Sequence, residues 1–174
     1  MSNQYSDWYA SAQPGLTVAS PGFKKAAGVD NKWYKRASII LDLAPTAFTI
    51  ADIARLMTFK PNDRIVEIFV SASGGTAVAA DLGIYLAGSA HDGAVVDVDR
   101  FASAITLAGT VARTERLIES TNIVDTDRGK MLWELLGLSA QPDPWVEYEL
   151  AFTATATLTT ADALVNVEAF GYFS

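Results

Sequence analysis

Residues 144–173 show the clearest alternation of hydrophobic and polar positions in the chain. Hydrophobic side chains occupy every second position from Val146 onwards, with Glu147 and Glu149 on the opposite face. The same period of two returns after the polar run at 157–162. This is the period of a β-strand with one buried face. The sequence therefore predicts one long β-hairpin at the end of the chain, with its turn in the polar run.

Shorter segments upstream show similar strand-like features. They are rich in β-branched and apolar residues, and residues such as Pro45 end them. The segment 49–59 also fits one face of a helix, but we favour a strand. In 63–73, the alternation places Ile68 on the inward face, with Ile65 and Phe69 on the opposite face. Further strands are predicted at residues 38–44, 49–59, 63–73, 81–87 and 95–99, with bent edge strands over 110–125.

Two connecting segments show helical features instead. In 99–109, Asp99 can cap a helix and Gly109 can terminate it. In 127–138, Met and Leu side chains recur at i, i+4 spacing. The whole pattern is then roughly seven to nine short strands with one or two short helices in connections, which is typical of an antiparallel β-sandwich or jelly roll. A parallel α/β fold would need a long helix between successive strands, and the sequence offers none.

The first part of the chain differs from the rest. Residues 1–36 show no sustained period of two or 3.6, and Pro and Gly interrupt them. We therefore expect an extended N-terminal arm over 1–36 and a β-sandwich domain over 37–174. The arm is rich in aromatic residues, which serve as anchors in segments that dock on a surface. Its docking surface could be a neighbouring copy, a larger assembly or its own domain.

The charges are distributed unevenly. Residues 1–36 carry five basic and two acidic side chains, a charge of +3, whereas the remainder carries eight basic and eighteen acidic side chains, a charge of -10. This asymmetry indicates that the two parts meet different surroundings. A nucleic-acid partner is not expected, because binding phosphates requires clustered Lys and Arg on the folded face.

Composition narrows the class of protein further. Half of the 174 residues are hydrophobic and 19% are charged, so we expect a folded chain. Since no apolar run reaches the roughly 18 residues of a membrane helix and no signal peptide is recognisable, we expect a soluble protein made without export. The chain has no cysteine, which excludes disulfides and thiolate metal sites.

Catalytic motifs are not found. The single histidine, His91, has Ser89 and Asp92 beside it, but members of a Ser-His-Asp triad come from distant chain positions. We interpret it as a solvated turn residue. The glycines at 74–75 and the Gly129-Lys130 pair lack the residues that complete a phosphate-binding loop. The sequence therefore predicts no enzyme and no cofactor.

Acidic residues offer one hypothesis for a metal site. Asp92, Asp97 and Asp99 are close in sequence and could give calcium its oxygen ligands. They lack the spacing of an EF-hand loop, and Asp is also the commonest residue at solvated loop positions, so solvated positions are the better explanation and no metal is predicted. We interpret Glu147 and Glu149 as the solvated outer face of a strand, because the carboxylates of a glycosidase come from separate elements.

Three aromatic residues near the end of the chain share the outward parity of these glutamates: Trp145, Phe170 and Tyr172. Exposed rings on a sheet face indicate either a platform for carbohydrate or a protein interface.

The order of several segments resembles a known class of proteins. These are DRIVEIFVSAS at 63–73, GGTAVAADLGIYLAG at 74–88, DRFASAITLAG at 99–109 and the run from MLWELLGL to VEAFGY at 131–172. Over roughly residues 47–173 the chain resembles the small β-sandwich virion proteins of tailed bacteriophages, in particular capsid decoration or cement proteins. The resemblance implies a jelly-roll-like domain, often a homotrimer, that sits on the capsid surface and ties shell subunits together.

We therefore expect a structural virion protein, assembled in the host cytoplasm, whose partners are other copies of itself and the major capsid protein, without membrane or nucleic acid. The alternatives are a carbohydrate-binding module and a phage tail or neck component. The expected interface residues are Tyr5, Trp8, Tyr9, Phe23, Trp33, Tyr34, Trp145, Phe170 and Tyr172.

Overall fold

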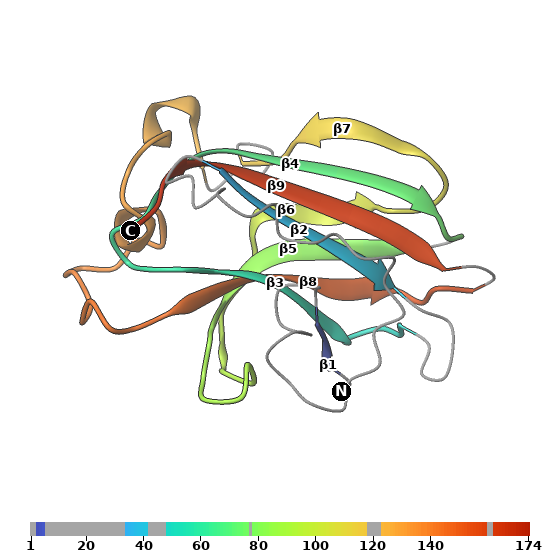
Figure 1. The fold of residues 1–174 in the computed structure, drawn as a ribbon, viewed down its shortest axis with the longest axis horizontal. Helices are drawn as coiled ribbons and strands as arrows, with labels where there is room; N and C mark the ends of the chain where they lie inside the picture. The colour runs from blue at the N-terminus through green and yellow to red at the C-terminus, as the bar shows by residue number, and fades with distance from the viewer. Residues whose placement is uncertain (1–2, 6–33, 42–47, 77, 118–122, 160–161) are drawn as a thin grey trace, which may run out of the picture.

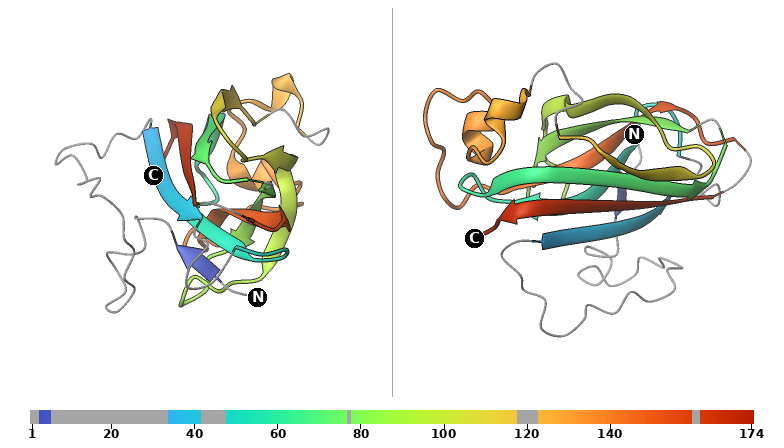
Figure 2. Two further views of the ribbon diagram at one scale, coloured as in Figure 1. Left: turned by 90° about the vertical axis from the view of Figure 1, so that its right-hand side faces the viewer. Right: turned by 90° about the horizontal axis from the view of Figure 1, so that it is seen from above.

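Two facing β-sheets make up the protein (Figures 1 and 2). The computed structural model describes residues 3–5, 34–41, 48–76, 78–117, 123–159 and 162–174. The strands in these ranges are β1 (Asn3–Tyr5), β2 (Tyr34–Leu41), β3 (Ile53–Phe59), β4 (Arg64–Gly74), β5 (Ala79–Leu86), β6 (Val95–Thr106), β7 (Val111–Glu115), β8 (Tyr148–Ala156) and β9 (Ala163–Tyr172).

The order of the strands is that of a jelly roll. Sheet A has the order β1-β3-β8-β5-β6, and sheet B has the order β2-β9-β4-β7. From β2 onward the chain changes sheet at every connection except β5 to β6, and all these strand pairs are antiparallel. β1 adds to the edge of sheet A, parallel to β3. The predicted fold class, an antiparallel β-sandwich of the jelly-roll type, is confirmed.

Two short helices lie in the described part of the connection between β7 and β8. They are the 3-10 helix η1 (Asp125–Asp127) and the single turn α2 (Leu132–Leu135). The prediction of a helix within 127–138 is confirmed, although α2 is only four residues long. Leu132 and Leu135 are buried and attach α2 to the core. None of the helices in the described ranges is long and hydrophobic enough to cross a membrane.

The two strands at the end of the chain do not form the predicted hairpin. β8 lies between β3 and β5 in sheet A, and β9 lies between β2 and β4 in sheet B. The connection crosses from one sheet to the other, and Leu158 within it is buried, its N–H donating to the carbonyl of Phe48 at 2.9 Å. Two half-buried strands show the same alternation in one sheet or in two facing sheets. The pattern therefore could not separate the two arrangements.

The prediction of helical turns over 99–109 is wrong, because β6 continues through this segment. Its pairing with β5 shifts register at several points. At one of these irregularities the backbone crosses Gly83 so closely that a Cβ there would lie 2.2 Å from the carbonyl oxygen of Val98. Ala104 adopts a positive φ of 51°, and its N–H donates to the Asp81 carboxylate at 2.7 Å. These bulges break the alternation that would have indicated a strand.

The core lies between the inner faces of the two sheets. In β4, Ile65 and Ile68 are both fully buried in it, because a bulge between Ile65 and Glu67 shifts the alternation by one residue. The prediction that Ile65 and Ile68 lie on opposite faces is therefore wrong for Ile65. The strand itself and the inward direction of Ile68 are as predicted.

We expect Ile68→Asp to prevent stable folding, because it places an unpaired carboxylate in the core. The loss in the free energy of unfolding should be about 4 kcal/mol or more. Ser71→Asp is the matched control, since Ser71 lies on the outer face of the same strand and is only half-buried. Urea unfolding followed by circular dichroism measures both variants. If Ile68→Asp unfolds at the same urea concentration as the parent, the inward assignment of Ile68 is wrong.

Candidate functional site

Three aromatic rings from three adjacent strands meet on the outer face of sheet B. Tyr34 of β2 and Phe170 of β9 are register partners, and their ring centroids are 5.0 Å apart. Phe69 of β4 contacts Phe170 edge-on, with centroids 5.9 Å apart. All three rings are half-buried, so each keeps part of its surface in contact with solvent. We call Tyr34, Phe69 and Phe170 the aromatic patch.

Charged groups hold the aromatic patch in place. The guanidinium of Arg113, on β7, lies over the ring of Phe69, 3.4 Å from its centroid, and its Nε donates to Oε2 of Glu168 at 2.6 Å. The hydroxyl of Tyr34 donates to Oε1 of the same carboxylate at 3.1 Å. Glu168 therefore links β7 to β2 across the face of the sheet. A surface fixed in this way loses little side-chain entropy when another protein covers it.

The same contacts shift the pKa values of the Glu168 carboxylate and the Tyr34 hydroxyl. Partial burial pushes the pKa of Glu168 upward, but the hydrogen bonds from Arg113 and Tyr34 outweigh it, and the pKa is lowered. Burial and the nearby Glu168 carboxylate together raise the pKa of the Tyr34 hydroxyl. At neutral pH the patch therefore carries a carboxylate paired with a guanidinium and a neutral phenol.

The predicted interface residues are only partly brought together. Tyr34 and Phe170 meet in the aromatic patch, and Tyr172, two residues further along β9, is 50% exposed. The backbone of Tyr5 belongs to β1. Trp8, Tyr9, Phe23 and Trp33 lie outside the described residues.

Phe69, Arg113 and Glu168 were missed as site residues by the sequence analysis. The alternation in β4 did place Phe69 on the outer face, so a search for outward-facing aromatic residues in every strand could have found it. Arg113 and Glu168 carry no comparable signal, because only the pairing of β4 with both β7 and β9 brings them to the patch.

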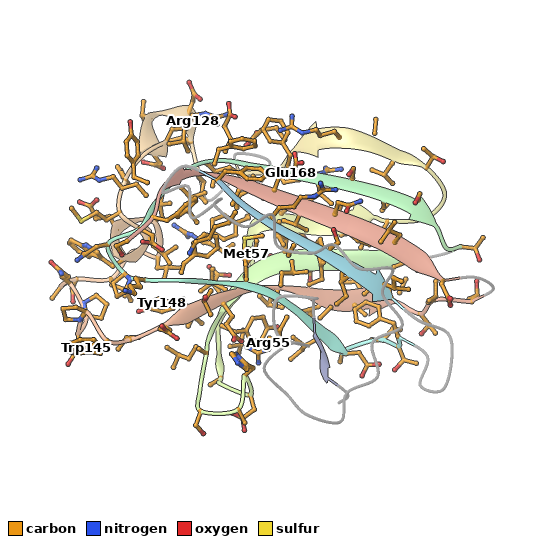
Figure 3. All side chains as sticks on the ribbon, in the orientation of Figure 1. Arg55, Met57, Arg128, Trp145, Tyr148 and Glu168 are labelled. Carbon is orange, nitrogen blue, oxygen red and sulfur yellow. The ribbon has the colours of Figure 1, made fainter. Side chains whose placement is uncertain are left out.

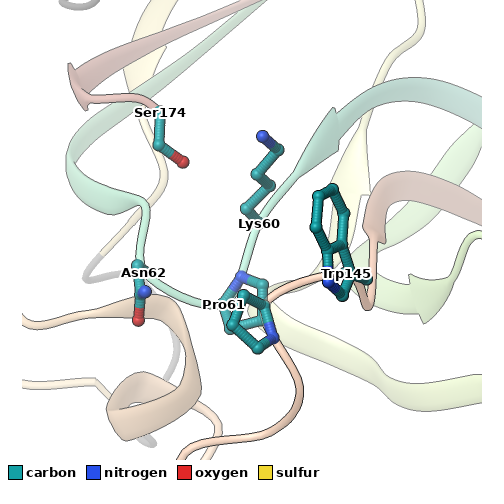
Figure 4. Close-up of a pocket in the computed structure, with 6 residues that line it drawn as sticks. Lys60, Pro61, Asn62, Trp145 and Ser174 are labelled. Carbon is teal, nitrogen blue, oxygen red and sulfur yellow. The ribbon is translucent and has the colours of Figure 1, made fainter.

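Trp145 stands apart from the aromatic patch, in the loop that leads into β8 (Figure 3). Its side chain is 88% exposed. The main-chain N–H of Trp145 donates to Oδ1 of Asp143 at 2.9 Å, and Pro142 and Pro144 restrict the backbone around it. The ring borders a shallow hollow of about 270 Å³ that Lys60 also lines (Figure 4).

The outer face of sheet A carries a buried ion pair instead of a solvated surface. Nη1 of Arg55 donates to Oε2 of Glu149 at 3.0 Å, and both side chains are almost completely buried. His91 contacts the other carboxylate oxygen, Oε1, through its Nδ1. The interpretation of Glu149 as a solvated residue is therefore wrong. So is the interpretation of His91 as a solvated turn residue, although Glu147 is exposed as expected.

The loop between β5 and β6 explains this burial. The Nη atoms of Arg55 donate to the carbonyls of Leu86 and Gly93 at 3.3 and 2.9 Å, which draws both ends of the loop over the sheet. The guanidinium carbon lies 4.4 Å from the ring centroid of Tyr85. Beside it, Ile53, Tyr85 and Ala151 form a second, small hydrophobic cluster. Sheet A is thus partly covered on its outer face as well as on its inner face.

The acidic residues proposed as calcium ligands do not form a site in the structure. Asp97 hydrogen-bonds with Asp99, and burial together with this contact raises the pKa of Asp97. Asp97 also lies 3.8 Å from Arg100. Among the described residues, no group of three or more His, Cys, Asp or Glu side chains could hold a metal ion.

Comparison with known proteins adds little to these observations. No family model and no curated protein matches the chain. A solved structure titled "Cyanophage Pam1 capsid asymmetric unit" contains a chain that is similar to this one, with a TM-score of 0.46 and 16% sequence identity over 94% of this chain and 96% of that chain. The function is therefore argued from the molecule itself.

We expect Glu149→Gln to lower the free energy of unfolding by about 3–5 kcal/mol, because it leaves the buried charge of Arg55 without its partner. The double variant Arg55→Met, Glu149→Leu should lose much less than the two single changes together. Lys130→Met, at an exposed ion pair with Asp127, is the control and should cost less than about 1 kcal/mol. Urea unfolding of the parent and of these variants, with the single changes Arg55→Met and Glu149→Leu included, checks the prediction, and equal losses for Glu149→Gln and Lys130→Met would contradict it.

Because the pKa of Glu168 is lowered in the folded protein, its carboxylate stabilises the fold above its ordinary pKa of about 4.3, and this contribution disappears as the pH falls and the group is protonated. We expect Glu168→Gln to be less stable than the parent by about 1 kcal/mol at pH 7. The difference should shrink as the pH falls below about 4. Thermal unfolding across pH 3–8 measures it, with the exposed Glu147→Gln as control. A difference that stays constant with pH would exclude this role.

Proposed function

We propose that this chain is a structural virion protein that binds the outside of a phage capsid and stabilises it by bridging shell subunits. It would do so through self-association of the β-sandwich and docking of its N-terminal residues. The observation that carries the proposal is the aromatic patch, a set of ordered rings that remains partly exposed on a flat sheet face. Aromatic residues and Arg dominate the energetic centres of protein interfaces, and here Arg113 lies directly over a ring of the patch.

The aromatic patch suits a protein partner better than a small ligand. Its three rings come from three neighbouring strands of sheet B, and Arg113 on the fourth strand, β7, covers one of them, so together they form a broad face. Oppositely charged groups on the patch are already paired with each other through Arg113 and Glu168. A partner can therefore cover the rings without leaving either charge unpaired, which is the main penalty when charged groups are buried.

The edge of sheet A supports a role for the N-terminal residues. β1 pairs with β3 in parallel, with Asn3 opposite Ile53 and Tyr5 opposite Arg55. This edge of the sandwich therefore accepts an added strand, a common way in which one protein chain binds another. Residues 6–33, which join β1 to β2, can span at most roughly 90–100 Å. That reach would allow the same pairing within one chain or between neighbouring chains.

Several modest contacts of this kind would add up on a capsid. A chain held by one sheet face and by its N-terminal residues binds more tightly than either contact alone, because the second contact forms at a high effective concentration. The acidic body, with a charge of -10 outside residues 1–36, argues against a nucleic-acid partner.

The test uses capsids of the phage that encodes the chain, prepared without it. We expect the protein to cosediment with them and to raise their disassembly temperature. The variant Phe69→Ser, Phe170→Ser should raise the dissociation constant at least about tenfold, because it removes two rings from the centre of the contact. Deleting residues 1–33 should also weaken binding while circular dichroism stays that of a β-protein, and it leaves β2 intact.

Leu164→Ser is the matched control, because Leu164 is an exposed hydrophobic residue of β9 outside the aromatic patch. It should bind capsids like the parent. If the parent does not bind capsids, or if the patch variant binds as well as the control, the proposal is wrong. Binding to glycans in place of capsids would favour the alternative of a carbohydrate-binding module.

A further inference from the structure

A hollow of about 410 Å³ lies on the outer face of sheet A. Ile53, Tyr85 and Val98, from three different strands, supply its hydrophobic lining. Its polar lining includes Arg55 and Asp92. A hydrophobic recess with a few polar groups is the usual form of a site that receives a side chain or a small ligand.

Arg55 is the unusual member of this lining. Its Nη atoms donate hydrogen bonds to the Glu149 carboxylate and to the carbonyls of Leu86 and Gly93. Its Nε is buried and has no hydrogen-bond partner among the described residues. An unpaired buried donor costs about 1–3 kcal/mol, so an acceptor supplied from outside would stabilise the site. Glu149 already balances the charge of Arg55, and Asp92 adds a negative charge nearby. The occupant should therefore be hydrophobic with a neutral acceptor beside it, and a strongly anionic ligand is disfavoured.

The chain itself carries a group with these properties. Trp145 projects into solvent from a loop that two prolines and the hydrogen bond to Asp143 hold in shape. The residues on either side of Trp145 each carry a main-chain carbonyl group that can accept a hydrogen bond. A rigid loop with one large exposed ring is a favourable anchor, because little conformational freedom is lost when it inserts into a pocket.

Trp145 cannot reach the hollow of its own chain. It precedes β8, whereas Thr153, which also lines the hollow, is eight residues further along, near the other end of this strand. The ring of Trp145 instead borders the separate hollow that Lys60 and Pro61 line, which shares no lining residue with this one. Figure 3 likewise shows Trp145 at one end of the molecule and Arg55 towards its middle.

We propose that Trp145 of one copy inserts into the hollow of a second copy, between Ile53, Tyr85 and Val98, with a neighbouring carbonyl accepting from Arg55. The inference rests on the self-association in the proposed function and specifies its contact. The two surfaces differ, so the contact is head-to-tail. Each copy has one knob, which is the Trp145 ring, and one hollow. Such contacts form a closed ring when the rotation between copies permits, for example a ring of three.

The test measures mass in solution by analytical ultracentrifugation. The parent should form oligomers. Trp145→Ala removes the knob, and Ala94→Arg, at an exposed position of the lining, fills the hollow, so each variant alone should be monomeric or have a dissociation constant raised at least about tenfold. An equimolar mixture of the two should form a dimer and nothing larger, because only one intact knob and one intact hollow remain. Val124→Ala, at an exposed hydrophobic residue of another surface, is the control and should associate like the parent.

Three results would overturn the inference. The first is a parent that stays monomeric, or a Trp145→Ala variant that associates like the parent. The second is two monomeric variants whose mixture does not dimerise. The third is a loss of thermal stability in monomeric Ala94→Arg that vanishes when residues 1–33 are deleted, which would show that the chain's own N-terminal segment occupies the hollow. Capsid binding by Trp145→Ala, measured in the same preparation, separates failure of this contact from failure of the proposed function.

Discussion

Packing between the inner faces of the two sheets is the interaction on which the rest of the structure depends. The strands of the jelly roll turn hydrophobic side chains towards the space between the sheets, and a Val, Leu, Ile or Phe there contributes about 1.5–3 kcal/mol only when the opposite sheet covers it. β8 and β9 show this directly. They follow each other in the chain yet lie in opposite sheets, where Phe152 and Val167 both belong to the shared core.

A buried carboxylate joins several chain segments at one end of the sandwich. Asp63 is fully buried and accepts hydrogen bonds from the N–H groups of Lys60 and Ser174 at 2.9 and 2.7 Å. Lys35 of β2 lies 3.5 Å from Asp63, and its Nζ donates to the carbonyl of Thr58 at 2.7 Å. Burial lowers the pKa of Lys35, and the charge of Asp63 opposes this effect. The last residue of the chain, the edge strand β2 and the turn before β4 are thereby joined.

The alternation of hydrophobic residues was sufficient to predict the fold class and most strands, because each strand buries one face. It failed where the backbone is irregular. Bulges in β4 and β6 displace Ile65 to the inner face and disguise the segment 99–109 as helical. It also could not assign strands to sheets, since the pairing of β8 with β3 and β5 joins segments that are far apart in sequence.

The candidate site was predictable only where a single residue carried the signal. Trp145, Phe170 and Tyr172 were named because their parity placed large rings on an outer face, and Tyr34 because aromatic residues are concentrated in the first 36 positions. Glu149 points to the outer face, as predicted, but it is buried and not solvated. The loop between β5 and β6, which Arg55 holds, covers it. Burial of an outward-facing residue depends on what lies above the sheet, and the period of a strand contains no information about that.

The two sheets use charge in different ways, and this difference bears on bridging. On sheet B, Arg113 and Glu168 lie near the surface and hold rings that remain accessible. On sheet A, Arg55 and Glu149 are buried and fix the loop that borders the hollow. A protein that bridges others needs at least two separate, ordered surfaces, since one surface can hold only one partner. The sandwich has one such ordered surface on each outer face, and because its core fixes both sheets, a force applied at one surface would be carried to the other.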